Sequence, residues 1–133
     1  MSSSISDAEL ISRAKAIVNP RYISRTVEVA TVGSALITET GAVHVGVCID
    51  AACGIGFCAE HAAVASMITS GESRIQTIVA VGKRGSVLSP CGRCRELLWQ
   101  IHPGNADTRI IMPGGKIVPL RDLLPSHWKV EGQ

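Results

Sequence analysis

The sequence contains few aromatic residues and no concentration of charge of one sign. Phe, Trp and Tyr make up 3% of the 133 residues, and the formal net charge is +2. Stacking of successive bases needs aromatic side chains, and binding to a phosphate backbone needs a concentrated basic surface. We therefore expect a small-molecule partner and no nucleic acid.

Long hydrophobic runs are also missing. No stretch reaches the roughly 18 consecutive apolar residues of a membrane span, so no membrane partner is expected. The first residues lack the basic and apolar regions of a secretory signal. Five cysteines, an odd number, do not form a disulfide framework. These features together favour a cytoplasmic protein, whose thiols stay reduced.

Apolar residues are nevertheless abundant for so short a chain. They make up 46% of the sequence, and the length is that of one domain, so residues 1–133 are expected to form a single domain. A domain of this size buries only a limited share of its surface. We therefore expect the excess apolar surface to be covered by further copies of the chain in a closed, symmetric homo-oligomer.

Hydrophobic periodicity predicts an α/β fold. A strand, a helix and a second strand follow one another in the second half, which implies a right-handed crossover between parallel strands. We expect one mixed sheet of about five strands with helices on both faces, a three-layer α-β-α sandwich. The predicted elements are helices from Ser6 to 18, over 58–70 and from Pro90 to 102, strands over 27–37, 42–49, 75–81, 109–112 and 116–118, a loop over 82–89 and a helical turn over 121–124.

Three cysteines lie at predicted helix starts. Cys58 begins one helix, and Cys91 and Cys94 lie in the first turn of another. Backbone N–H groups and the positive end of the helix dipole stabilise thiolates at such positions. The C-x-x-C spacing lets two sulfurs reach one ion, and a third sulfur from a neighbouring helix leaves the fourth tetrahedral position of zinc open. An open position is typical of a catalytic zinc ion.

Glu60 follows Cys58 by two residues and is expected to face that open position. Water on zinc ionises near neutral pH, and a neighbouring carboxylate is then needed to carry its proton to a substrate. Cys-Ala-Glu followed by Pro-Cys-Gly-Arg-Cys matches the zinc deaminase pattern, in which the glutamate is not a ligand. We therefore predict a hydrolase that removes ammonia from an aminopyrimidine, with one zinc ion per chain.

Other interpretations of the cysteines remain open. The C-x-x-C pair is also found in thioredoxin-type redox sites. Cys48 and Cys53 would close a four-thiolate structural zinc site, in a module without turnover; the simpler interpretation makes both of them small buried apolar residues. A further alternative is a protein that binds its ligand without converting it.

Three thiolates around a divalent ion leave a negative site, so a nearby cation is expected. Arg93, between Cys91 and Cys94, is the preferred counter-charge. Arg95 is more simply a solvated helix arginine. His61 is placed either to donate to a thiolate or to pack within an alanine-rich helix.

At this point the sequence resembles the cytidine deaminase superfamily and, within it, the blasticidin S deaminases. The resemblance is strongest over residues 88–95, 102–104 and 123–126. It implies a three-layer fold and a homotetramer with active sites built partly from neighbouring subunits. It also implies that Cys58, Cys91 and Cys94 are zinc ligands and that Glu60 carries the proton.

The match to cytidine deaminases weakens at the expected sugar side. Their Asn-x-Glu-Asn segment corresponds to residues 47–50, where Val47 and Ile49 replace polar residues. Glu28 and Asp50 are expected near this side, where they would favour a substrate with a positive group. Trp128 stands where relatives place an aromatic residue over the ring, and an interface anchor is an equal alternative. The substrate class is therefore a cytidine, deoxycytidine or blasticidin S type compound.

Overall fold

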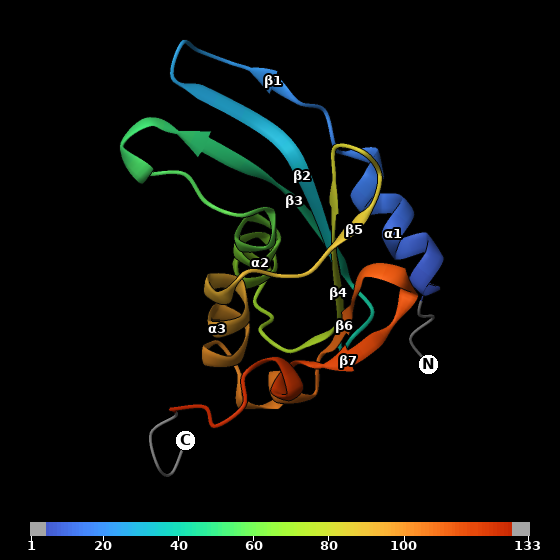
Figure 1. The fold of residues 1–133 in the computed structure, drawn as a ribbon. Coiled ribbons are helices and arrows are strands. Elements are labelled where there is room, and N and C mark those ends of the chain that lie inside the picture. The colour runs from blue at the N-terminus through green and yellow to red at the C-terminus, as the bar shows by residue number, and fades with distance from the viewer. Residues whose placement is uncertain (1–4, 129–133) are drawn as a thin grey trace.

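The computed structural model describes residues 5–128, and these form one mixed sheet with helices on both faces (Figure 1). No helix among them is long and apolar enough to cross a membrane. The helices are α1 (Asp7–Ala16), α2 (Ala59–Thr69) and α3 (Gly92–Gln100), with shorter 3-10 turns η1 (Ala52–Gly54), η2 (Pro103–Asp107), η3 (Pro113–Gly115) and η4 (Leu120–Leu123). The strands are β1 (Arg21–Tyr22), β2 (Val27–Thr38), β3 (Val43–Ala51), β4 (Ile75–Gly82), β5 (Val87–Leu88), β6 (Arg109–Ile111) and β7 (Ile117–Pro119).

Five of these strands span the sheet in the order β3-β2-β4-β6-β7. The two-residue strands add to it, β1 beside β2 and β5 beside β4. β4 and β6 are parallel, as the predicted crossover through α3 requires, and the other pairs are antiparallel. The expected mixed sheet is therefore confirmed, while β1 and β5 were missed because two residues carry no hydrophobic period.

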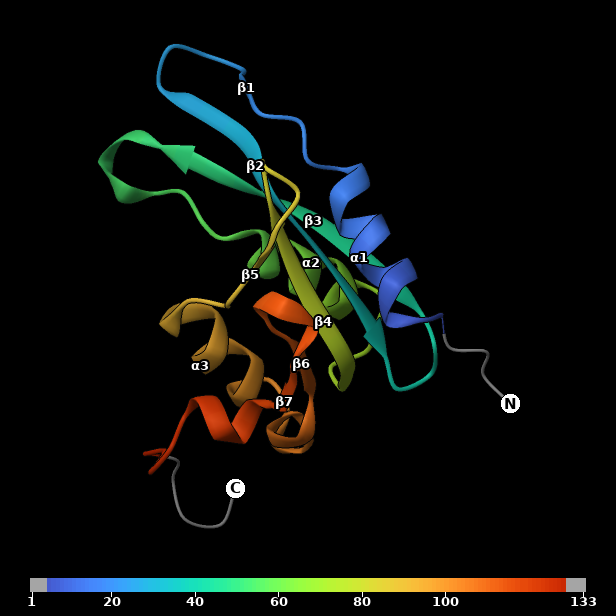
Figure 2. The ribbon, with the colours of Figure 1, turned by 45° about the vertical axis from the view of Figure 1, so that its right-hand side comes forward.

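Alternate residues of the central strands pack against opposite layers. Leu36, Ile78 and Ile110 face α2 and α3, together with Met67 and Leu98 of those helices. The neighbouring residues on the same strands belong to the cluster that α1 covers: Ala35, Ile37, Val79, Val81 and Ile111. Successive side chains of a strand point to opposite faces, so the continuous apolar run of β4 fits a strand covered on both sides. Figure 2 shows α1 on one side of the sheet and α2 and α3 on the other.

Helix α1 begins with a side-chain cap, whereas α2 and α3 begin after a cysteine that makes no capping hydrogen bond. The Ser6 side chain accepts a hydrogen bond from the Glu9 backbone N–H at 3.0 Å, which begins α1 as predicted. The predicted start of α3 at Pro90 is wrong, because Cys91 keeps an extended backbone and acts as the N-cap, so the helix begins at Gly92. Cys58 is likewise the N-cap of α2. Both cysteines therefore stand just outside their helices, beside the free backbone N–H groups.

Candidate active site

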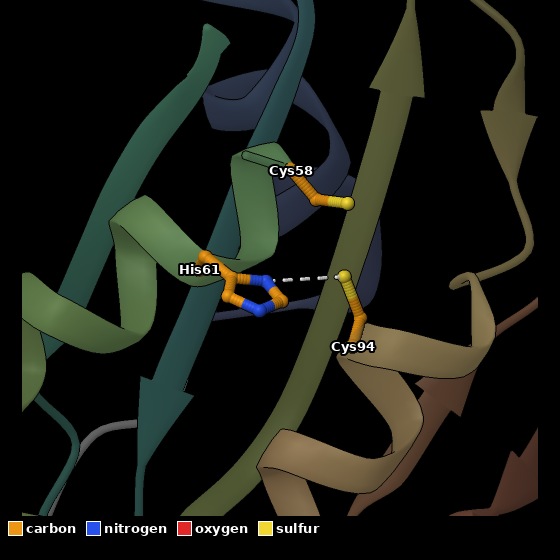
Figure 3. Close-up of side chains that lie close together, drawn as sticks. All are labelled: Cys58, His61 and Cys94. Atoms are coloured by element: carbon orange, nitrogen blue, oxygen red, sulfur yellow. Dashed lines mark hydrogen bonds between the residues drawn. The ribbon is translucent and has the colours of Figure 1, made fainter. Parts of the chain in front are cut away.

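The N-termini of α2 and α3 meet on one face of the sheet, and each helix is preceded by a cysteine as its N-cap. Cys58 Sγ lies 3.4 Å from Cys91 Sγ, and Cys91 Sγ lies 3.5 Å from Cys94 Sγ. Figure 3 shows Cys58, which precedes α2, and His61 of α2 pointing toward Cys94 of α3. The ligand atoms of these three residues lie within 4.8 Å of one another. The three cysteines predicted to share an ion are therefore brought together.

The environments of the three thiols differ. Burial opposes ionisation of Cys91, but the backbone N–H groups of Cys94 and Arg93 and the two neighbouring thiols lower its pKa overall. Burial and the contact with Cys91 raise the pKa of Cys58. Burial also raises the pKa of Cys94, and the Glu60 carboxylate beside it adds to the effect. Cys91 is thus the readiest thiolate, and a divalent cation between the sulfurs would favour the other two.

Glu60 lies in the first turn of α2 and is 6% exposed. Burial raises the pKa of its carboxyl, opposed by its own backbone N–H and by the Cys94 thiol. A raised pKa makes a carboxyl more ready to take up a proton and pass it on, which suits a general acid–base. Glu60 lines the same cavity as Cys58 and Cys91.

That cavity, of about 470 Å³, is lined by the cysteines and by residues of β2 and β3. A bulge in β2 helps to form its wall: the β2–β3 register shifts between Val29 and Gly33, and Ala30 adopts a left-handed φ of 63°. Thr31 and Val32, which follow Ala30 within the bulge, both line the cavity. Sequence analysis missed Thr31, because no motif marks a bulge.

The residues around the cysteines have separate contacts. Arg93 is exposed and lines the cavity. The pKa of His61 is lowered mainly by its own burial and also by the positive charge of Arg93. His61 Nδ1 lies 3.5 Å from Cys94 Sγ, which agrees with the predicted hydrogen bond to a ligand sulfur and not with simple packing within the helix. The prediction of a solvated Arg95 is wrong: Arg95 donates to the carbonyls of Pro90 and Leu123, at 2.8 and 3.3 Å, and so fixes the loop before α3.

The expected sugar-side residues lie together in the structure. Asp50 lines both the cavity and a neighbouring hollow, and Glu28, its partner across β2 and β3, lines that hollow alone. Cys48 also lines the cavity, 3.1 Å from Thr31 Oγ1, whereas Val47 is outside the wall. Trp128 lies away from the cavity lining: it is 62% exposed and donates to Glu96 Oε2 at 3.0 Å.

Neither additional cysteine joins the cluster. Cys48 is buried, as expected for a small apolar residue, but its thiol contacts Thr31. Cys53 is exposed in η1, so the prediction that it is buried is wrong. Within residues 5–128, the group of side chains suited to a metal contains Cys58, His61 and Cys94 and neither of these cysteines.

Comparison with known proteins identifies the family. The sequence model of the cytidine and deoxycytidylate deaminase zinc-binding region matches residues 5–108. This chain belongs to that deaminase family. It is 36% identical over 103 residues to a cytidine deaminase of Mycobacterium tuberculosis, covering 75% of this chain and 74% of the relative. It is also 36% identical over 106 residues to a blasticidin-S deaminase of Bacillus cereus, covering 71% and 74%.

Solved structures agree with this membership. A crystal structure of cytidine deaminase from M. tuberculosis superposes with a TM-score of 0.80 at 29% identity, covering 96% of this chain and all of that one. One from Burkholderia pseudomallei gives 0.75 at 27% identity, covering 93% of this chain and all of that one. The resemblance to the superfamily and the three-layer fold are thereby confirmed, and the chain is a zinc-binding hydrolase of cytidine deaminase type.

The residues present fit a zinc ion. Tetrahedral zinc–thiolate bonds of about 2.3 Å place neighbouring sulfurs about 3.8 Å apart. The two measured separations, 3.4 and 3.5 Å, are within a few tenths of an ångström of that value. Zinc prefers sulfur and imidazole donors such as these, whereas magnesium and calcium prefer oxygen donors.

Proposed function

We propose that the chain hydrolyses the exocyclic amino group of an aminopyrimidine nucleoside or nucleoside analogue, releasing ammonia. Cys58, Cys91 and Cys94 are the zinc ligands in this proposal, and Glu60 is the catalytic proton carrier. The observation that carries it is a single cavity lined by two of these thiols and a buried carboxyl with a raised pKa. Family membership and the cluster of thiols support the same chemistry.

Cys91, not His61, completes the proposed ligand set. Its sulfur lies within 3.5 Å of both other sulfurs, and helix N–H groups lower its pKa. His61 reaches Cys94 through Nδ1 and suits a supporting role, in which its N–H donates to the ligand sulfur. Such hydrogen bonds orient metal ligands and tune the metal.

The remaining residues supply binding and proton transfer. When bound, a zinc ion with one open ligand position activates a water molecule as the nucleophile. Glu60 would accept one proton from the attacking water and deliver it to the ring nitrogen. It would then carry the second proton of that oxygen to the amine, which departs as ammonia. Val32, Phe57 and Ala80 give the cavity an apolar wall for a flat ring. Arg93 offsets the negative charge of three thiolates.

An ammonia-release screen tests this function and identifies the substrate type. Zinc-loaded protein is assayed against cytidine, deoxycytidine, cytosine and blasticidin S, and again after chelation and after zinc is restored. We expect release from at least one compound, lost on chelation and regained with zinc. Zinc at one per chain with no release from any compound would contradict the proposal. Release that chelation leaves unchanged would contradict the role of zinc.

We further propose a homotetramer. Large apolar side chains exposed on one copy support a larger assembly: Tyr22 is 69% exposed, Ile23 62% and Ile55 76%, and Trp128 would then be an interface anchor. Light scattering coupled to size exclusion should give four times the 14.0 kDa chain mass. A mass of one chain at micromolar concentration would contradict this.

A cytoplasmic setting also remains a proposal, supported by five cysteines that form no disulfide.

A further inference from the structure

The end of the described chain lies against α3, as Figures 1 and 2 both show. We call residues 123–128 the C-terminal clasp. His127 Nε2 lies 3.0 and 3.1 Å from the two carboxylate oxygens of Glu96, and the His127 ring stacks on Trp99 with the ring centroids 4.1 Å apart. Trp128 Nε1 donates to Glu96 Oε2 at 3.0 Å. Two residues of α3 thus hold the far end of the clasp.

Two features of the clasp oppose this docking. Ser126 adopts a left-handed φ of 56°, a backbone conformation that costs free energy in a residue with a side chain. The side chain of His127 is 6% exposed, and within residues 5–128 its Nδ1 atom has no hydrogen-bond partner. Burial of an unpaired polar atom also costs free energy. These costs offset part of the contacts with α3, so the clasp should open with less free energy than unfolding of the domain requires.

Arg95 joins the clasp to the zinc ligand Cys91. Its Nε donates to the Pro90 carbonyl at 2.8 Å, and a second guanidinium nitrogen donates to the carbonyl of Leu123, the first residue of the clasp, at 3.3 Å. The backbone N–H of Arg95 donates to the Cys91 carbonyl at 3.0 Å. Arg95 therefore holds both peptide groups that flank Cys91.

These two carbonyl bonds restrain the direction of the Cys91 sulfur. A peptide group is planar, so a fixed carbonyl on either side of Cys91 limits the rotation of that residue. Cys91 is exposed, and its side chain makes no capping hydrogen bond. Its orientation therefore depends on the backbone bonds that Arg95 supplies.

We infer that Arg95 is a positioning residue for Cys91, and that docking of the C-terminal clasp and zinc binding favour each other through it. This inference rests on the proposed zinc ligands and adds control of that site by the end of the chain. With the clasp docked, Leu123 and Pro90 together fix the guanidinium. With the clasp open, Cys91 gains freedom that zinc binding must remove. Such coupling is reciprocal, so zinc should also stabilise the docked clasp.

The zinc affinity of Arg95 variants, measured by chelator competition, tests the positioning role. Arg95→Met keeps the length of the side chain and removes its donors, so zinc binding should weaken about tenfold, as is usual for residues that support metal ligands. Arg95→Lys should restore part of the loss, because its ammonium donates but lacks the planar fork that reaches both carbonyls. Arg109→Met is the matched control. Arg109 also joins distant segments, but its hydrogen bonds go to Asp7 and Thr77, so the parent zinc affinity should remain.

A double-mutant cycle tests whether the clasp acts through Arg95. His127→Ala removes contacts between the clasp and α3 and should weaken zinc binding about threefold. In Arg95→Met protein the same change should have no further effect, because the link to the zinc site is already lost. His44→Ala is the control, since His44 contacts the other helix of the site, α2, through Ser66 at 2.9 Å and should leave zinc affinity unchanged.

Tryptophan fluorescence reports the clasp without any need for turnover. Both tryptophans of the chain, Trp99 and Trp128, take part in the contacts between α3 and the clasp. Removal of zinc from the parent protein should shift their emission to longer wavelength and increase its quenching by acrylamide, because Trp99 loses its stacked partner and gains contact with water. Arg95→Met protein should give the same emission with and without zinc.

A zinc affinity of Arg95→Met equal to that of the parent would overturn the inference. Additive effects of Arg95→Met and His127→Ala would also overturn it, and so would parent fluorescence that zinc does not change. Should Arg95→Met fail to fold, the affinity of His127→Ala and the parent fluorescence decide by themselves. Ammonia release is assayed separately at saturating zinc. Coupling without release from any compound would count against the deaminase function and leave the inference in place, and release without coupling would do the reverse.

Discussion

Replacing Cys91 and replacing His61 should affect zinc binding to different extents. A structural zinc site contributes about 10–16 kcal/mol, or about 2.5–4 kcal/mol for each of four ligands. Loss of Cys91, whose sulfur lies within 3.5 Å of both other sulfurs, should therefore weaken zinc binding by about two to three decades. His61 contacts one ligand sulfur and is a supporting residue, so its loss should cost about one to two decades.

Chelator competition measures both affinities, and cobalt substitution separates the two roles. In Cys91→Ala, the absorbance from thiolate-to-cobalt charge transfer should fall by about a third, because two of three thiolates remain. In His61→Asn it should keep its intensity. Cys53→Ala is the matched control, because this exposed thiol lies outside the cluster, and its zinc content should be unchanged. Greater loss of zinc in His61→Asn than in Cys91→Ala would refute the assignment.

Three further predictions concern the scaffold. Asp7 pairs with Arg109, whose hydrogen bonds lower the pKa of Asp7 below its usual 3.8. Asp7→Asn should therefore cost about 0.5–1 kcal/mol of unfolding free energy at pH 7. Urea denaturation should show that the difference between variant and parent becomes smaller as the pH falls below 3.8. Asn105 is fully buried and bonds three backbone groups, so Asn105→Ala should cost about 2–4 kcal/mol of unfolding free energy. About 3–4 °C is expected per kcal/mol for a chain of this length, so a thermal midpoint within about 1 or 2 °C of the parent would contradict this. A Cβ at Gly46 would lie 2.4 Å from a backbone atom of α2, so Gly46→Ala should displace α2 and reduce both stability and ammonia release, whereas Gly92→Ala, with open space at its Cβ, should leave stability unchanged.

Much of the site was predictable because its chemistry depends on local spacing. Cys58, Glu60 and the Cys91–Cys94 pair stand in short motifs at helix starts, and each motif fixes its own geometry within one turn. The parallel pairing of β4 and β6 was also predictable, because the two strands are joined by a crossover through α3.

The cavity wall could not be predicted in the same way. Thr31 enters it through a bulge in β2, and nothing in residues 47–50 indicated that Cys48 lines the cavity while Val47 does not. Arg95 was misjudged because its partners, the carbonyls of Pro90 and Leu123, carry no side-chain signal. These features depend on contacts between distant segments, which periodicity does not report.

Single-turnover ammonia release by Glu60→Gln is the most direct test of the central claim. The substitution keeps the size of this buried side chain and leaves the three thiols in place, so zinc should remain at one per chain. The account predicts a loss of at least about 10²–10⁴-fold in rate, the usual contribution of a general acid–base, with the substrate still bound. Retention of the parent rate with zinc in place would contradict the assignment of Glu60 as the proton carrier.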